Sequence, residues 1–299
     1  MKKAMKVRKT GGDRLFHIFC ISVVVFLALI VLLPLMSVVA NSFSSPQAVN
    51  SGKVLIWPVD FTLENYKAVF NYKVIWSGYR NTIFYTIVGT LINVSLTLIC
   101  AYPLSVRTFS GRKVINKLLM ITMIFSAGMI PNYILVRDLG LMNSIWAVLL
   151  PGAMSAYNVI ITRTYIMTSI PSDLEEAAKI DGCDPFRYFL RFVLPLSKAI
   201  IAVIAMYYAV AHWNSYFSAF LYLSDREKYP LQLFLREVLI SSKFDSSSIE
   251  DVELREQMSM LSATLKYVII VVSTLPLMCL YPFVQKHFVK GVMIGSVKG

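Results

Sequence analysis

Charged residues, cysteines and histidines are scarce in this 299-residue chain, and each shortage excludes a class of protein. Only 15% of the residues are charged and 57% are hydrophobic, whereas soluble domains have roughly 45–50% apolar residues. The four cysteines form no CxxC pattern and three of them lie in apolar segments, so neither disulfides nor metal sites are expected. The composition therefore indicates a protein that crosses a membrane several times.

The chain also lacks the residue patterns that ATPases and enzymes need. The phosphate-binding pattern GxxxxGK[ST] does not occur, so the chain is not expected to hold ATP in a P-loop. Its three histidines, His17, His212 and His287, lie far apart and do not assemble a nucleophile–base pair or a metal site. We therefore expect no catalytic residue, no metal and no bound cofactor in this chain.

A net charge of +12 would suit a nucleic-acid-binding protein, but the basic residues are scattered rather than gathered into one patch. Membrane proteins accumulate Lys and Arg in their cytoplasmic loops, and this accounts for the charge. The lipid bilayer is therefore an expected partner, and nucleic acid is not.

Six apolar segments are long enough to cross a bilayer, which takes about 20 residues. They lie near residues 15–40, 81–106, 117–136, 143–167, 198–223 and 263–285. The first is too long for a signal peptide, whose apolar region has roughly 7–15 residues. The predicted fold is an all-α integral membrane protein with six transmembrane helices, in which residues 15–290 form a single domain.

The distribution of basic residues predicts the orientation of these spans. Residues 1–14 are strongly basic, and further basic residues lie between the second and third spans and near the tail 291–299, namely Arg107, Arg112, Lys113, Lys117, Lys286, Lys290 and Lys298. The connection 224–262 is instead rich in Asp and Glu. Because Lys and Arg mark the cytoplasmic side, both termini and the loop 172–195 are predicted to be cytoplasmic.

A polar stretch between the fourth and fifth apolar segments has the pattern of two short helices joined by a turn. Ser172 and Glu175 have the spacing of a capping box, and Gly182 suits the left-handed residue that ends a helix. Asp184 is predicted to cap the second helix, and Pro185 suits its first position.

The same stretch resembles the EAA loop of bacterial ABC importer permeases. Glu176-Ala177-Ala178 is followed after three residues by Gly182 and, after nine more, by an apolar residue, a spacer and Leu194-Pro195. The apolar residue is Phe192, where this family usually has Ile. Over the region from about Ile130 onward, the chain resembles carbohydrate-type permeases related to the smaller subunit of the maltose importer. Three sequences resemble the subgroup that serves complex oligosaccharides: Ile130-Pro131-Asn132-Tyr133, Arg137-Asp138-Leu139-Gly140-Leu141 and His212-Trp213-Asn214.

The resemblance implies the fold of a type I ABC importer permease and a set of partners. These are a second homologous permease that completes a heterodimer, two cytoplasmic ATPase subunits that bind ATP and Mg²⁺, and an extracytoplasmic solute-binding protein or lipoprotein. The implied function is import of an oligosaccharide, a polysaccharide breakdown product, through the bacterial cell membrane by alternating access. The residues that the resemblance assigns to ATPase coupling are Glu175, Glu176, Ala177, Ala178, Asp181, Gly182, Leu194 and Pro195. A purely structural connector is the alternative for this loop, since capping alone would permit it.

The fifth apolar segment carries aromatic and hydrogen-bonding side chains at helical spacing, which predicts a polar stripe. Sugars suit such a surface, because their C–H faces stack on aromatic rings and their hydroxyls need donors and acceptors. The candidate substrate path comprises Tyr208, His212, Trp213, Asn214, Tyr216, Asn132, Tyr133 and Asn158. Helix packing is the alternative for these side chains, because polar and aromatic residues also bridge membrane helices. Arg163, near the cytoplasmic end of its span, is expected to snorkel to the interface.

An ion-coupled secondary transporter of a small polar solute is the alternative function. Such a protein would have charged residues or broken-helix ion sites near the middle of the membrane. The predicted spans contain almost no Asp or Glu, so the importer is the favoured interpretation.

Overall fold

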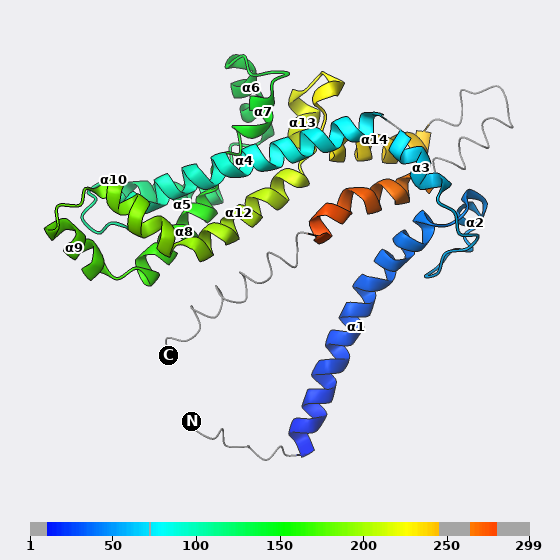
Figure 1. The fold of residues 1–299 in the computed structure, drawn as a ribbon, viewed down its shortest axis with the longest axis horizontal. Helices are drawn as coiled ribbons and strands as arrows, with labels where there is room; N and C mark the ends of the chain where they lie inside the picture. The colour runs from blue at the N-terminus through cyan, green and yellow to red at the C-terminus, as the bar shows by residue number, and fades with distance from the viewer. Residues whose placement is uncertain (1–10, 72, 245–263, 280–299) are drawn as a thin grey trace. The chain divides into compact units, whose positions relative to one another are not determined.

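The computed structural model describes residues 11–71, 73–244 and 264–279 (Figure 1). Regular secondary structure within these ranges is helical throughout. The chain divides into two compact units, Met1–Asn71 with Leu239–Val272 and Tyr72–Val238 with Ser273–Gly299. Residues 1–10 of the predicted basic N-terminus, the end of the sixth predicted span and the tail 291–299 lie outside the described residues.

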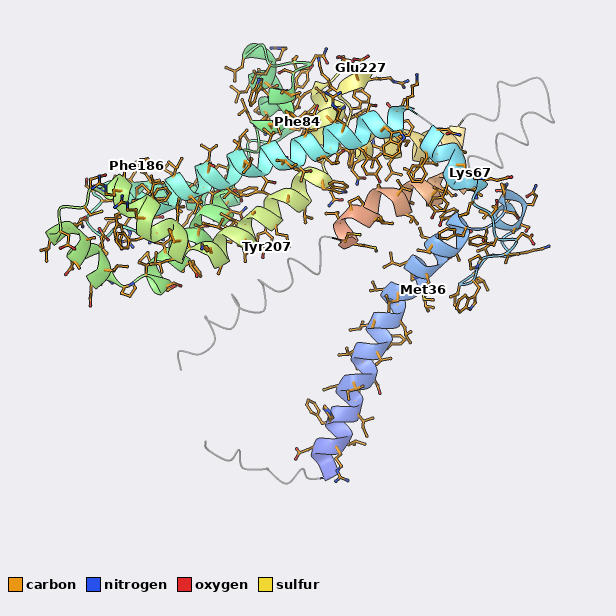
Figure 2. The ribbon with its side chains drawn as sticks, viewed as in Figure 1. Met36, Lys67, Phe84, Phe186, Tyr207 and Glu227 are labelled. Atoms are coloured by element: carbon orange, nitrogen blue, oxygen red, sulfur yellow. The ribbon has the colours of Figure 1, made fainter. Side chains whose placement is uncertain are left out.

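The first unit begins with α1, Gly11–Ser42, which has 32 residues. Its length is about 48 Å at 1.5 Å per residue, more than the roughly 30 Å of a bilayer core. Its most apolar window has a mean hydropathy of 3.2 and is 0% buried, and its side chains stand out around the helix (Figure 2). An apolar helix exposed on all sides indicates a membrane environment.

The end of α1 continues into a folded segment that includes α2, Pro46–Asn50, and α3, Glu64–Asn71. The buried hydroxyl of Ser44 donates to the carbonyl of Ala40 at 2.7 Å and accepts from the N–H of Val59 at 3.0 Å. The side-chain amide of Asn65 donates to the carbonyl of Ser44 at 2.9 Å. These bonds satisfy polar groups where the chain leaves the helix, so the segment folds back on the end of α1.

The second unit is organised around α4, Lys73–Ser105, a helix of 33 residues. Two further helices pack along it, α8 (Ala156–Ser169) and α12 (Lys198–Trp213) (Figure 1). Residues from all three helices fill the core between them, among them Leu98, Ala101, Leu104, Val159, Ile166 and Ile204. The second predicted span therefore forms the central helix of this unit.

Three segments that were predicted as single spans are interrupted in the structure. Residues 117–136 fall in α5 (Arg112–Ile124) and α6 (Met129–Asp138), which meet at 115°. Gly128 lies between them with φ +85°, a conformation that glycine adopts at little cost. A hydropathy pattern counts apolar residues and does not register such a turn.

The other two interruptions lie in the fourth and fifth predicted spans. Residues 143–167 contain α7 (Ile145–Leu149) and most of α8, separated by a stretch that includes Pro151-Gly152. Proline and glycine both oppose a continuous helix, which explains the break. Residues 198–223 contain α12 and α13 (Phe217–Tyr222).

Two helices, α1 and α4, are individually long and apolar enough to cross a membrane among the described residues. Two bent pairs raise the number to four if each counts as one span, and Thr264–Cys279 is a shorter apolar helix. The chain is therefore an all-helical membrane protein with several apolar helices, and the count of six spans stays a prediction.

The connection after α13 is held against α4. It contains a 3₁₀ turn, Arg226–Lys228, and leads into α14, Leu231–Phe244. The amide of Asn81 donates to the carbonyls of Glu227 at 2.6 Å and Tyr229 at 3.0 Å, and the Tyr85 hydroxyl donates to the carbonyl of Lys228 at 2.8 Å. Side chains that lie 143 to 148 residues earlier in the sequence thus hold this connection in place.

Candidate functional site

The EAA-like loop forms a short helix, α9 (Ser172–Ile180), at one end of the second unit (Figure 1). Gly182 follows it with φ +71°. The N–H of Cys183 donates to the carbonyl of Ala178 at 2.9 Å, and the N–H of Gly182 donates to that of Lys179 at 3.1 Å. This pair of bonds is a Schellman motif. The prediction that Gly182 ends the helix in the left-handed conformation is confirmed.

The predicted capping box at the start of α9 is wrong. Pro171 is the residue that precedes the first helical turn, and no side chain caps that turn. Ser172 is already the first helical residue, and its hydroxyl donates to the carboxylate of Asp173 at 3.3 Å. The helix starts one residue early because extended backbone at Ile170 and Pro171 leads directly into it.

The second helix of the loop is capped as predicted. The carboxylate of Asp184 accepts from the N–H groups of Phe186 at 2.9 Å and Arg187 at 3.1 Å, and α10 (Pro185–Tyr188) begins with proline. The predicted helix does not continue regularly, because Phe189–Val193 form a π-helical turn. Such turns occur frequently at functional sites.

The loop presents one face to the protein and another to its surroundings. Ala178 is 7% exposed and packs into the core, whereas Glu176, Ala177 and Asp181 are exposed. Two large apolar side chains of the loop are also exposed, Ile180 on α9 at 87% and Phe186 on α10 at 69%; Phe186 is labelled in Figure 2. These apolar side chains lie beside charged ones and are accessible from outside the unit.

Beneath the loop, an aromatic cluster joins it to α4. Ring centroids are 5.1 Å apart for Tyr102 and Phe189, 6.5 Å for Tyr102 and Tyr188, and 5.3 Å for Tyr188 and Phe192. The cluster places Phe192, the departure from the family pattern, against Tyr188. Leu194 is half-buried and Pro195 is exposed. The packed rings therefore connect the loop with α4.

A cavity of about 480 Å³ lies between the loop and the ends of α4 and α8. Charged side chains line it on the side of α9, where Glu175 and Lys179 form an ion pair of 2.7 Å. The other polar residues that line it include Tyr102, Ser105, Arg107, Thr108, Thr168, Ser169, Ser172, Glu176 and Tyr188.

Three candidate path residues on α12 hold helices together. The buried hydroxyl of Tyr208 lies 2.8 Å from that of Thr97 on α4 and accepts from the N–H of Ser155 at 3.1 Å. The indole N–H of Trp213 donates to the carbonyl of Ser273 at 3.0 Å. These contacts are of the bridging kind that was the alternative to solute contact.

His212, the third of these residues, lies against α4. The Nε2 of His212 is 3.1 Å from the side-chain amide of Asn93. In the amide orientation that satisfies both groups, the Asn93 oxygen accepts from Nε2 and the Asn93 nitrogen donates to the carbonyl of Gly89 at 2.8 Å. A Cβ atom at position 89 would overlap the His212 ring. Gly89 therefore provides the space that the imidazole occupies.

The remaining candidate path residues are dispersed. Asn158 is buried at 6% exposure, and Asn132 is exposed on α6. The ring of Tyr133 stacks on that of Tyr222 with centroids 6.2 Å apart. The structure does not bring the eight predicted residues together into one group.

Two of them reach the surface beyond the end of α12. Asn214 is exposed and its amide donates to the carbonyl of Val210 at 2.9 Å, and Tyr216 is 40% exposed. Arg163, expected to snorkel to the interface, donates from Nε to the carbonyl of Leu104 at 3.0 Å. This places a cation at the C-terminal end of α4, where it is favourable.

Comparison with known proteins agrees with this fold. Residues 14–294 match the family described as "Binding-protein-dependent transport system inner membrane component". The polygalacturonan/rhamnogalacturonan transport system permease protein YtcP of Bacillus subtilis (strain 168) is 41% identical over 287 residues, covering 96% of this chain and 99% of that protein. Protein LplC of the same organism is 39% identical over 302 residues, and the match covers 100% of this chain and 100% of that protein.

A similar structure has also been solved. The crystal structure of a bacterial ABC transporter involved in the import of the acidic polysaccharide alginate contains a chain with a TM-score of 0.84 and 34% identity. The match covers 93% of this chain and 98% of that one. The predicted family, the non-catalytic transport role and the location in the inner membrane are confirmed by these comparisons. The chain belongs to the family of binding-protein-dependent transport system inner membrane components.

Proposed function

We propose that this chain is the transmembrane permease subunit of an ABC importer that moves an oligosaccharide, a polysaccharide breakdown product, into the cytoplasm. The proposal is supported by two similar proteins that match 96% and 93% of the chain and whose descriptions name polysaccharide transport. The structural observation that carries the proposal is the exposed face of α9. This helix ends in a Schellman motif and has exposed apolar and charged side chains.

In this proposal α9 couples the permease to a cytoplasmic ATPase. The coupling residues are Glu175, Glu176, Ala177, Ala178, Asp181, Gly182, Leu194 and Pro195. The small side chain of Ala177 allows close approach of the ATPase, and Ile180 and Phe186 provide apolar contact area. The aromatic cluster that joins Phe189 to Tyr102 passes the movement on to α4.

The complete importer contains a second homologous permease, two ATPase subunits that bind ATP and Mg²⁺, and an external solute-binding protein or lipoprotein. The permease crosses the membrane six times with both termini in the cytoplasm. ATP binding closes the ATPase pair, α9 moves with it, and the cavity between the permeases opens in turn to each side. No covalent bond of the sugar is made or broken by this chain.

For the substrate path, the contacts of the candidate residues support two different roles. Tyr208, His212 and Trp213 position the helices, because their polar atoms bond to neighbouring segments. Asn214 and Tyr216 lie exposed where α12 ends, and we assign contact with the sugar to them. The end of a helix leaves polar groups available to a solute, which agrees with this position.

The test is mass spectrometry of proteins that co-purify with the chain after gentle extraction from its native membrane. An ATPase, a second permease and a binding protein are expected, and uptake of oligosaccharide into reconstituted vesicles should require ATP. A chain that purifies alone after cross-linking, or uptake that persists without ATP and follows an ion gradient, would overturn the proposal in favour of a secondary transporter.

A further inference from the structure

An arginine lies over two aromatic rings beyond the end of α12. The guanidinium carbon of Arg236, on α14, is 4.3 Å from the ring centroid of Phe220 and 5.5 Å from that of Tyr216. Phe217 meets Tyr216 edge-on with centroids 6.4 Å apart. We call these four residues, Tyr216, Phe217, Phe220 and Arg236, the aromatic–arginine platform.

The rings of the platform are accessible from outside the unit. Tyr216, Phe217 and Phe220 are 40%, 48% and 51% exposed, and they follow one another at the start of α13. A contiguous exposed aromatic surface rimmed by polar groups is a candidate binding surface. Aromatic rings bind the C–H faces of sugars, so the platform offers a stacking surface for a pyranose ring.

The guanidinium of Arg236 has hydrogen-bonding capacity to spare. Within the described ranges 11–71, 73–244 and 264–279 it makes no hydrogen bond or ion pair, and it lies over the two rings. The nearby Arg226, by contrast, pairs with the carboxylate of Glu237 at 3.5 Å. Stacking uses the face of a guanidinium and leaves its N–H edges available for a planar anion.

The base of α14 is fixed, so Arg236 is held in place before any ligand arrives. The N–H of Leu231 donates to the hydroxyl of Thr82 on α4 at 2.9 Å. Gly78 brings the backbone of α4 so close to Leu231 that a Cβ there would lie 3.2 Å from the Leu231 Cα. Arg236 follows within two turns of this anchor, and pre-organised binding groups cost less entropy on binding.

We propose that the aromatic–arginine platform binds an acidic sugar, a uronate unit of the oligosaccharide. The sugar ring packs into the corner between the perpendicular rings of Tyr216 and Phe217, stacking on one of them, and its carboxylate accepts two N–H bonds from the edge of Arg236. Bidentate pairs of this kind are strong and geometrically selective. The inference rests on the proposed function and names the substrate class, because a neutral sugar would leave the guanidinium without an anion.

The experiment uses the complete transporter, purified with its partners and reconstituted into vesicles. The probes are short oligosaccharides of galacturonate and of mannuronate, each compared with its methyl ester, which has the same sugar ring without the charge. The variants are R236Q, R236K and, as a matched control, R226Q, which removes a cation from the same connection without touching the rings. Membrane insertion and thermal unfolding of each variant are measured alongside.

R236Q is expected to lower the kcat/KM for import of the acidic probes about tenfold or more, since it removes a charge-assisted bond. Import of the methyl esters should change less than about twofold, and R226Q should resemble the wild type for both probes. R236K should fall in between, because lysine keeps the charge but lacks the planar fork.

Equal losses for acidic and esterified probes in R236Q would show that Arg236 only packs α13 against α14, and would overturn the inference. Unchanged import of the acidic probes would do the same. If the wild-type transporter imported the methyl esters but not the acidic probes, the inference would be overturned while the proposed function would stand. Import of neither kind of sugar, with an intact ATPase, would overturn both.

Discussion

The hydroxyls of Tyr208 and Thr97 lie 2.8 Å apart in the buried interface between α12 and α4, 111 residues apart in the sequence. The same tyrosine oxygen accepts from the N–H of Ser155, the residue that caps α8. One buried phenol thus joins the three helices at the centre of the second unit. In a membrane, where water is absent, such bonds fix helices at particular heights relative to one another.

Replacing Tyr208 by Phe should destabilise the protein, because the N–H of Ser155 and the hydroxyl of Thr97 lose a buried partner. The expected cost is about 1–3 kcal/mol. Thermal unfolding in detergent measures it, with Tyr157→Phe as the control, since Tyr157 is 53% exposed. Equal unfolding temperatures for the two variants would show that the hydroxyl of Tyr208 does not stabilise the contact between the three helices.

Gly89→Ala should push α12 away from α4, because the added Cβ overlaps the His212 ring. A loss of about 1–3 kcal/mol is expected from overpacking. Gly152→Ala is the control, since a Cβ at Gly152 meets nothing within 4 Å. His212→Ala in the Gly89→Ala background should recover part of the loss, and strict additivity of the two changes would contradict the contact.

Gly182→Asp should abolish uptake and leave the protein inserted. Its φ of +71° favours glycine at the end of α9, and the helix is the proposed contact with the ATPase, to which the substitution adds a charged side chain. Gly140→Asp is a matched control, because Gly140 has a similar φ of +67° in the connection after α6. Loss of uptake and of ATPase co-purification in the first variant only would support the coupling role, and normal uptake in it would refute that role.

Glu176→Lys should also abolish uptake while the protein inserts normally. The side chain is exposed on the outer face of α9, so reversing its charge alters the docking surface without disturbing the core. Arg191→Glu, another charge reversal at an exposed position of the same loop region, tests whether any reversal has this effect. Uptake at the wild-type level in Glu176→Lys would place the docking surface elsewhere.

The connection before α14 should be sensitive to acid. The pKa of Asp225 is lowered from its ordinary value, first because its carboxylate accepts from the N–H of Glu227 and second because it pairs with Lys228. A lowered carboxyl pKa stabilises the fold above the unfolded-state pKa, and this contribution disappears as pH falls through the folded-state value.

Asp225→Asn should therefore flatten the dependence of the unfolding temperature on pH below about pH 4, where an unperturbed Asp begins to bind its proton. Thermal unfolding is followed from neutral to acidic pH for both proteins. An identical acid dependence in the variant would show that Asp225 contributes nothing to it.

Local chemistry in the loop was predictable because it depends on neighbours in the sequence. Gly182 takes its left-handed conformation and Asp184 caps its own helix, and both effects act within three residues. Ser172 fits the same kind of pattern but lies one residue inside the helix. A cap depends on the position where the backbone turns, and Pro171 moved that position by one residue.

The polar residues of α12 show where such reasoning ends. Helical spacing placed Tyr208 and His212 on one face, but their partners, Thr97 and Asn93, lie 111 and 119 residues away. The spacing of Tyr208 and His212 along α12 does not show which helix their shared face meets. Solute contact and helix packing were therefore equally compatible with the pattern. Likewise, nothing in the sequence joins Arg236 to the rings of Tyr216 and Phe220.

The sequence by itself determined that this chain is an apolar, helical membrane protein, because composition and short-range spacing decide that property, and the loop 172–195 carries its resemblance to the permease family. Only the tertiary structure decided where the helices break, which polar side chains bridge them and which remain exposed. Those outcomes depend on close packing between segments far apart in the sequence, where the room left by Gly89 or the hydroxyl of Thr97 selects a partner.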